Sequence, residues 1–362
     1  AVTVHVLGNY TSPSVQLKQL PAHITNLSIE SQSETDMQVI ELIGALFIDL
    51  DPIEHPGALQ SFSMRGIHLK GTTPNEPMFH INGQFSVTIT DCILSNGGGD
   101  EGATPVLIST NQTNVKLTRV TIQGMQSTAL AVFSLVVEGG ELQVQSLRLE
   151  ENTNVGDGLF VQSISGKFTL DQVLFRANNI SKSTLMLDIC GAEVAHITNL
   201  QLLDEDQDKV EYLPDSPTCL TTVTLNNLTI DGASVHTLKT LSAQGTLSIL
   251  VPNLTKLDDV VNQTVLVFEN GTMEFSKILL IDEVDQTVQC QAPGFMEDNV
   301  LQVTFKKCVP GISKEVDVAM AVMVVFIFIL VSSSVGLLIY YCAFYDGQPK
   351  LSNAHSFSDI EE

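Results

Sequence analysis

The chain has 362 residues, of which 41 are acidic and 17 are basic, and its formal net charge is −24. This charge argues against a nucleic-acid partner, because phosphate binding needs clustered lysine and arginine side chains. Hydrophobic residues make up 44% of the chain, which is enough for a substantial core, and the abundance of Val, Ile, Leu and Thr is typical of strands.

The first residues precede the regular part of the sequence. We expect segment 1–21 to cap the open end of the fold, because an uncovered sheet edge invites pairing with other chains. A first apolar set starts forty residues before the next one and consists of Ala22, Ile24, Leu27 and Ile29. A loop or an irregular coil at residues 31–56 is therefore expected between the two sets.

A repeat begins at Phe62. Apolar residues recur at positions x, x+2, x+5 and x+7, as they do in residues 62–69. Further sets, 24 to 28 residues apart, start at Val87, Val115, Leu142, Phe168, Ala195, Val223, Leu247 and Met273. In the set that starts at Leu247, Pro252 occupies x+5 and Leu254 occupies x+7. A period of this length is typical of solenoid proteins.

The spacing within each set predicts a bend. Positions x and x+2 share one face of a strand, but x+5 would face outwards unless the chain turned at x+3 to x+4. Polar links that contain Gly or Asn, such as Asn96 to Asp100, follow x+7 and suit turns. A third apolar stretch, such as Val106 to Ile108, comes next in most sets. Three short strands in about 26 residues make one coil, and stacked coils bury the inward residues of their neighbours.

This pattern resembles the right-handed parallel β-helix, the fold of pectin-lyase-like proteins and of many surface proteins with parallel β-helix repeats. The resemblance covers residues 22–282 and lies in the coil pattern alone. It implies an all-β solenoid of about nine or ten coils, roughly 45 Å long at about 4.8 Å per coil, and it says little about function. A β-sandwich is the alternative, because it also shows strands and turns at regular spacing. The constant period favours the solenoid.

The six cysteines suit an oxidising compartment. Cys190 and Cys219 stand five and four residues before the starts of consecutive sets, so stacked coils would bring them within disulfide distance. We expect Cys290 and Cys308 to form a second disulfide that closes the base of the solenoid. Cys92 occupies an inward x+5 position, where we expect a buried free thiol.

Eight Asn-X-Ser/Thr sequons predict a glycoprotein that carries N-linked glycans and no other cofactor. The asparagines are Asn9, Asn26, Asn111, Asn179, Asn227, Asn253, Asn262 and Asn270. All of them precede residue 318, so they place the large N-terminal part outside the cell or in the lumen of the secretory system. The chain begins with Ala1 and not with Met, as though a signal peptide had been removed.

Residues 318–342 predict a single transmembrane helix. They run for twenty-five residues without a charge, and about 20 apolar residues suffice to span a bilayer. The lysine count disagrees with the sequons, because Lys306, Lys307 and Lys314 precede this segment and only Lys350 follows it. The sequons outweigh it, since long domains are translocated largely regardless of charge.

The expected domains follow from these signals. They are a cap (1–21), a β-helical ectodomain (22–289), a disulfide-closed membrane-proximal segment (290–317), the transmembrane helix (318–342) and a cytoplasmic tail (343–362). Ser332 and Gly336 have the small-xxx-small spacing that lets another helix approach closely. The alternative is that small residues are simply tolerated there.

Signals for chemistry are weak. Asp204, Asp206, Asp208 and Asp215 could converge on a calcium ion, but Lys209 stands where a calcium loop favours Gly, and an acidic solvated loop is the simpler interpretation. The chain has no Trp to stack against a sugar, and its eight His are scattered singly. We therefore expect no enzyme, no metal and no small-molecule substrate.

The sequence thus predicts a non-catalytic, type I, single-pass membrane glycoprotein. Its β-helical ectodomain would act as a binding or assembly platform, as an accessory subunit of a larger membrane complex such as a pump or channel. A cell-surface adhesion or receptor protein is the alternative, and a polysaccharide-active enzyme is the third hypothesis. The expected partners are the membrane and other membrane-protein subunits.

Overall fold

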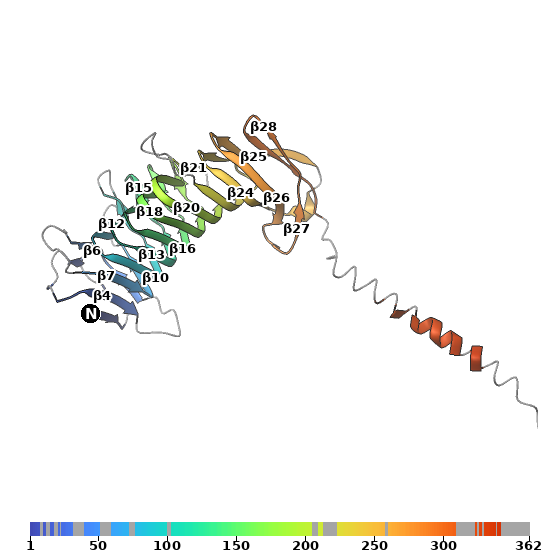
Figure 1. Ribbon diagram of the computed structural model, residues 1–362, viewed down its shortest axis with the longest axis horizontal. Helices are drawn as coiled ribbons and strands as arrows, with labels where there is room; N and C mark the ends of the chain where they lie inside the picture. The colour runs from blue at the N-terminus through green and yellow to red at the C-terminus, as the bar shows by residue number, and fades with distance from the viewer. Residues whose placement is uncertain are drawn as a thin grey trace, which may run out of the picture. The chain divides into compact units, whose positions relative to one another are not determined.

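The computed structural model describes residues 1–7, 10–11, 15–17, 21, 23–31, 40–50, 59–71, 77–99, 103–204, 209–212, 223–257, 260–308, 323, 326–327, 329–337 and 339–341. The chain divides into two compact units, Ala1–Cys308 and Val309–Glu362. The first unit contains strands β1 to β29 and the short 3-10 helix η1 (Leu254–Lys256). Its strands stack as a parallel β-solenoid of the right-handed type (Figure 1). The predicted all-β solenoid is confirmed.

The first strand of each coil pairs in parallel with the first strand of the next coil. In chain order these strands are β1 (Val2–Val6), β4 (Asn26–Ser31), β7 (Ser61–Arg65), β10 (Ser86–Ser95), β13 (Val115–Gln123), β16 (Glu141–Glu150), β18 (Asp157–Arg176), β20 (Leu185–Leu203), β22 (Thr224–Asp231), β24 (Ser242–Val251) and β26 (Thr272–Asp282). Their register follows the repeat, since Phe62 pairs with Val87 and Val87 pairs with Val115. The β-sandwich alternative is wrong, because its strands would pair antiparallel.

Each coil turns at x+4, where the first strand passes into the second. The residues there adopt left-handed backbone conformations with φ between 52° and 63°, and they are Asp91, Arg119, Ser146, Gln172, Asn199 and Asn227. Gly66, with φ 67°, takes this place in the coil that starts at Phe62. One left-handed residue reverses the inward and outward alternation, so the side chains at x+5 and x+7 face inwards again. The predicted bend is confirmed.

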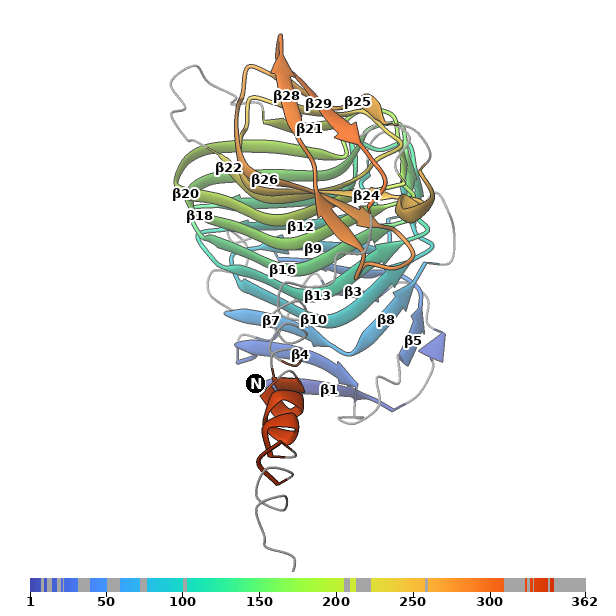
Figure 2. The ribbon, with the colours of Figure 1, turned by 90° about the vertical axis from the view of Figure 1, so that its right-hand side faces the viewer.

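Two further faces complete the coil. The second strands are β2 (Tyr10–Thr11), β5 (Ile40–Ile43), β8 (Ile67–Lys70) and the later parts of β10, β13, β16, β18, β20, β22, β24 and β26. The third strands are β3 (Val15–Leu17), β6 (Leu46–Asp49), β9 (Phe79–Gly83), β12 (Val106–Asn111), β15 (Ala131–Glu138), the first parts of β18 and β20, β21 (Lys209–Tyr212), β23 (His236–Lys239) and β25 (Val261–Glu269). A short ladder at the corner between these faces consists of β11 (Gly98–Gly99), β14 (Gln126–Ser127), β17 (Thr153–Asn154) and β19 (Asn179–Ile180). Figure 2 shows the stacked strands from the side.

The inward side chains form one continuous core. Leu170, for example, is 0% exposed and stacks between Val144 of the preceding coil and Ile197 of the following coil. Burying such a side chain contributes about 1.5–3 kcal/mol relative to leaving it in water. Because both of these partners belong to neighbouring coils, each coil depends on the others for stability.

The predicted set that starts at Leu247 is wrong. Leu247 pairs with Leu228, so it holds position x+5 and not x. Ala243 pairs with the x+2 residue of the preceding coil, so it holds x+2, and the buried Leu241 holds x. The bend of this coil contains one extra residue, at which the register shifts. Leu254, the predicted x+7 residue, lies in η1. The small side chain at x+2 and the changed spacing at the bend hid this set in the sequence.

The N-terminal end also differs from the prediction. Leu27 pairs with Phe62, so it holds position x of its coil and not x+5. Its second strand is β5, which follows residues 32–39, and these lie outside the described part of the chain. Segment 1–21, which we expected to form a cap, contributes β1, β2 and β3 as a further coil paired in parallel with β4, β5 and β6.

Antiparallel strands end the solenoid. β27 (Gln289–Gln291) pairs with β26, and β28 (Gly294–Glu297) forms a hairpin with β29 (Val300–Phe305), which also pairs with β25. Asp298 and Asn299 make the hairpin turn with φ 46° and 65°, as a two-residue turn requires. The disulfide between Cys290 and Cys308, whose Cα atoms are 5.9 Å apart, confirms the predicted pair.

The second unit has helical residues between Met323 and Tyr341. Among the residues described, no helix is both long enough and apolar enough to cross a membrane.

Candidate functional site

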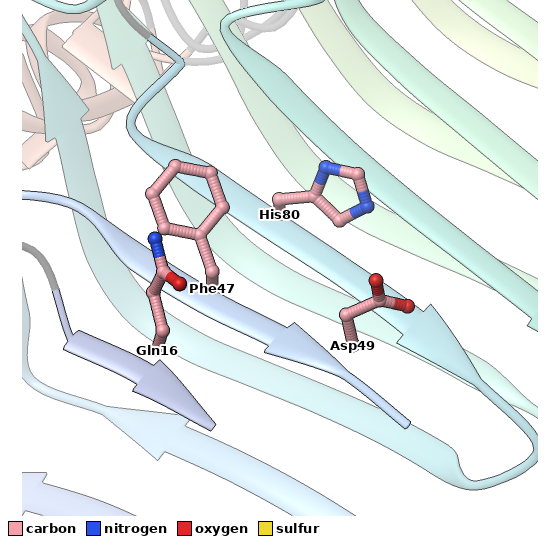
Figure 3. A pocket seen from close by; sticks show the side chains of 4 residues that line it. All are labelled: Gln16, Phe47, Asp49 and His80. Carbon is pink, nitrogen blue, oxygen red and sulfur yellow. The ribbon is translucent and has the colours of Figure 1, made fainter. Parts of the chain in front are cut away.

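A shallow pocket lies on the outer side of the third strands, in the coils nearest the N-terminus. Four side chains line it, and they are Gln16 on β3, Phe47 and Asp49 on β6 and His80 on β9 (Figure 3). The register explains their convergence, since Gln16 pairs with Phe47 and Phe47 pairs with His80. Stacked strands lie about 4.8 Å apart, so these outward side chains are neighbours.

The pocket combines an aromatic ring with hydrogen-bonding groups. The rings of Phe47 and His80 have centroids 6.1 Å apart and are tilted by 42°. Asn82 donates a hydrogen bond from Nδ2 to Oδ1 of Asp49 at 2.9 Å, which orients the carboxylate. Burial lowers the pKa of His80, and the Asp49 charge opposes this shift. A neutral imidazole, a carboxylate, an amide and an aromatic ring can together hold a small polar ligand.

Sequence reasoning missed this pocket. The apolar pattern of the sequence shows third strands only from Val106 onwards, so it does not place Asp49 beside His80. Asn82 and its partner Asp49 are 33 residues apart in the sequence, because the coil between them contains an insertion. This insertion hid the repeat. The pocket could have been found by aligning the sequence around Phe47 with the sequence around Phe79. Both residues lie in apolar strands with alternating burial.

Most of the predicted glycosylation sites that the structure describes are exposed. The exposed asparagines are Asn26, Asn111, Asn179, Asn253, Asn262 and Asn270, and they lie at strand ends and corners. Asn9 lies outside the described residues. A glycan attached at any of the six exposed positions would project into solvent.

Asn227 has a different environment. It is half-buried at the left-handed bend of β22, where its Nδ2 donates to Oδ1 of Asn199 at 3.2 Å. Asn199 in turn donates to Oδ1 of Asp171 at 2.9 Å, and the backbone N–H of Thr246 donates to Oδ1 of Asn227 at 3.0 Å. A glycan on Asn227 would perturb this ladder of amides, so its occupancy is expected to be lowest.

The predictions for the other cysteines differ in their outcome. Cys219 lies outside the described residues, as does the side chain of Cys190, so their predicted disulfide stays a prediction. Cys92 is a buried free cysteine, as predicted. Burial raises the pKa of its thiol to about 12, so it remains protonated at neutral pH. It packs in the core as a small apolar group.

The predicted calcium ligands lie almost wholly outside the described residues. Asp204 is described, and it is an exposed corner residue with φ 56°. Asp206, Asp208 and Asp215 are not described. Within the described ranges, no group of three or more His, Cys, Asp or Glu side chains could hold a metal ion.

A buried polar cluster lies between the corner after β19 and the third strands. Ser183 donates its backbone N–H to Oδ1 of Asp157 at 3.1 Å and its hydroxyl to Oε2 of Glu211 at 3.1 Å. Burial raises the pKa of Asp157. Burial also acts to raise the pKa of Glu211, but hydrogen bonds from Lys209 and Lys239 outweigh it and lower that pKa. The cluster ties adjacent coils together through charge-assisted bonds.

The two helix-packing residues lie in the second unit. Ser332 and Gly336 are both exposed, and a Cβ placed on Gly336 would meet no atom within 4 Å. The hydroxyl of the neighbouring Ser334 donates to the carbonyl of Val331 at 3.1 Å, which satisfies it within the helix. Packing of another helix against Ser332 and Gly336 stays a prediction.

No family model, no curated protein and no solved structure matches this chain.

Proposed function

We propose that the chain is a type I, single-pass membrane glycoprotein whose β-solenoid is a non-catalytic assembly platform, acting as an accessory subunit of a larger membrane complex. Residues 318–342 would span the bilayer, and the first unit would lie outside the cell or in a lumen. The observation that carries the proposal is the position of the sequons. Of the seven that the structure describes, six present their asparagine to solvent at strand ends or corners.

The solenoid supports the platform role through its rigidity. Its faces are built from long parallel ladders over a core of closely stacked side chains. Such a scaffold presents outward side chains at fixed spacing, which suits a subunit that must keep its partners in register. The pocket at Phe47 and His80 favours the second candidate, a cell-surface receptor or adhesion protein, because it could hold a small polar ligand.

Glycan mapping tests the topology. The full chain, expressed in a eukaryotic secretory host, should lose several glycan masses on enzymatic deglycosylation. Asn179→Gln should remove one glycan, whereas the matched change Asn178→Gln, at a buried asparagine outside any sequon, should leave the glycan number unchanged. Protease added to vesicles with the tail outside should remove only residues after Tyr345. An unglycosylated chain with a cytosolic first unit would refute the proposal.

Co-purification tests the role as a subunit. We expect other membrane-protein chains to co-purify with the full-length protein in mild detergent. Ser332→Leu together with Gly336→Leu should abolish this association, because it fills the space that another helix would occupy. Val331→Leu together with Val335→Leu is the matched control on an adjacent face of the helix. Recovery of the protein alone, with a bound small ligand, would favour the receptor instead.

A further inference from the structure

All four arginines of the chain lie on one part of the solenoid surface. They are Arg65 on β7, Arg119 on β13, Arg148 on β16 and Arg176 on β18. Arg65 and Arg119 flank the bend, at x+3 and x+4 of their coils, and Arg148 and Arg176 lie on the second strands. We name this region, with Asp91 and Glu150, the arginine surface. It extends over about four coil steps, or roughly 19 Å.

Two carboxylates organise the four guanidinium groups. Asp91 accepts a hydrogen bond from Nη2 of Arg119 at 2.8 Å, and this bond is the largest cause that lowers the pKa of Asp91, to which the charge of Arg65 also contributes. Glu150 lies 2.6 Å from Nη2 of Arg148 and 3.4 Å from Nη2 of Arg176. Glu150 thus contacts two arginines and Asp91 contacts Arg119, so the four guanidinium groups outnumber the two carboxylates.

The arginines remain accessible while they are held in place. The side chains of Arg119, Arg148 and Arg176 are 57%, 47% and 43% exposed, whereas those of Asp91 and Glu150 are only 14% and 12% exposed. The half-buried carboxylates therefore hold the guanidinium groups in position, and the guanidinium groups face solvent. Preorganisation of this kind lowers the entropy cost of binding.

The charge of this surface opposes that of the rest of the molecule. The chain carries −24 overall, yet the four arginines outnumber Asp91 and Glu150, and exposed Lys116 lies on the coil of Arg119. Glu30 pairs with Arg65 in register and reduces this positive excess by one charge. The nearby carboxylate of Asp171 is engaged by Asn199. None of the described sequon asparagines lies on the second strands between β8 and β18, and the nearest along the chain is Asn179, at the corner after Arg176.

Apolar side chains lie between the cations. Ile93 pairs with Thr121, Thr121 with Arg148 and Arg148 with Leu174 along one outward column of the second strands. Ile93 and Leu174 are half-buried, so they offer aliphatic surface beside the guanidinium groups. This mixture matches a protein segment that carries both acidic and aliphatic side chains better than it matches a sulfated sugar or a lipid headgroup.

We propose that the arginine surface binds an acidic, partly aliphatic segment of a partner protein. Arginine suits this role because its planar fork matches a carboxylate with two parallel hydrogen bonds, and arginine is enriched at the energetic centres of interfaces. The inference rests on the proposed platform function, and it adds where on the solenoid the partner docks and by what chemistry.

The test uses the full-length protein in detergent and a fluorescein-labelled peptide of repeating Glu-Glu-Leu units. Arg148→Gln together with Arg176→Gln should weaken peptide binding about tenfold or more, because both guanidinium groups that would bind carboxylates of the peptide are lost. Lys306→Gln together with Lys307→Gln removes the same charge from two other exposed positions and should leave affinity unchanged. Arg148→Lys with Arg176→Lys keeps the charge and should bind with intermediate affinity.

Four results would overturn the inference. One is the absence of peptide binding at low salt, and another is an equal loss in the arginine and lysine double variants. The third is preferential binding of a heparin oligosaccharide through the same arginines, which would make the ligand a sulfated sugar. Circular dichroism of each variant confirms folding. If native partners still co-purify with the arginine double variant, the platform function stands and the docking surface is refuted. If no partner co-purifies with the wild type, the platform function itself is refuted.

Discussion

Leu170→Ala should destabilise the solenoid by about 3–4 kcal/mol. Leu170 is 0% exposed and lies between Val144 and Ile197, so two adjacent coils contact the side chain that this change removes. Removing the three carbons beyond Cβ loses about 2.4 kcal/mol at about 0.8 kcal/mol per methylene. The remaining cavity adds to this, because coils held by parallel ladders cannot collapse freely, and measured Leu→Ala costs are about 2–5 kcal/mol.

Urea unfolding, followed by circular dichroism, measures this effect. Leu130→Ala is the matched control, because Leu130 is 57% exposed and its truncation should change stability by about 0.5 kcal/mol or less. A solenoid can unfold in stages, so hydrogen exchange should show the loss of protection concentrated in β16, β18 and β20. Equal effects of the two changes would refute the inward assignment of x+2 side chains.

Further predictions concern the bend, the cysteines and a buried acid. Gln172→Gly should stabilise the protein by about 1 kcal/mol in urea unfolding, because Gln172 is held at φ 56° and a left-handed conformation costs a residue with a Cβ about 1–2 kcal/mol. Cys290→Ser with Cys308→Ser should cost about 3 kcal/mol through loss of loop closure, with hydrogen exchange increased mainly in β27 to β29. Cys92 should resist iodoacetamide at pH 8 in the native protein and react after unfolding, as read by peptide mapping, because its thiol pKa is raised to about 12. Glu211 has a lowered pKa, so its stabilisation is present above the ordinary value of 4.5 and is lost as pH falls, and Glu211→Gln should flatten that part of the stability profile.

The sequence alone determined the solenoid because its apolar pattern carries two periods at once. Alternation within a strand gives the inward face, and recurrence after about 26 residues gives the coil. From Phe62 to Val223 these signals agree, and the register matches them residue by residue. The odd step between x+2 and x+5 even located the bend, where Asp91 and its counterparts adopt left-handed conformations. The burial of Cys92 was predicted by the same reasoning, whereas the pair Cys290 and Cys308 was predicted from its position at the base of the solenoid.

Local patterns failed where the signal was weak or the spacing changed. Ala243 leaves position x+2 without a large apolar side chain and one extra residue lengthens the bend, so Leu247 was taken for the start of its coil. An insertion separates β4 from β5, so the sequence pattern placed Leu27 at the wrong position in its coil. In both places the hydrogen-bonded pairing with neighbouring coils decided the register, because a ladder aligns whole strands and tolerates one poor apolar position.

The tertiary structure decided which outward side chains meet wherever the coil spacing changes. Outward positions show no apolar period of their own, so the sequence aligns them only through the inward sets, and an insertion removes that alignment. Stacking brings Asp49 beside His80 and Glu150 beside Arg176, pairs that lie 31 and 26 residues apart in the chain. The physical reason is the solenoid itself: it converts a separation of one coil into about 4.8 Å. The apolar pattern of the sequence therefore predicts the core, whereas the surfaces that could bind a partner depend on how the coils stack.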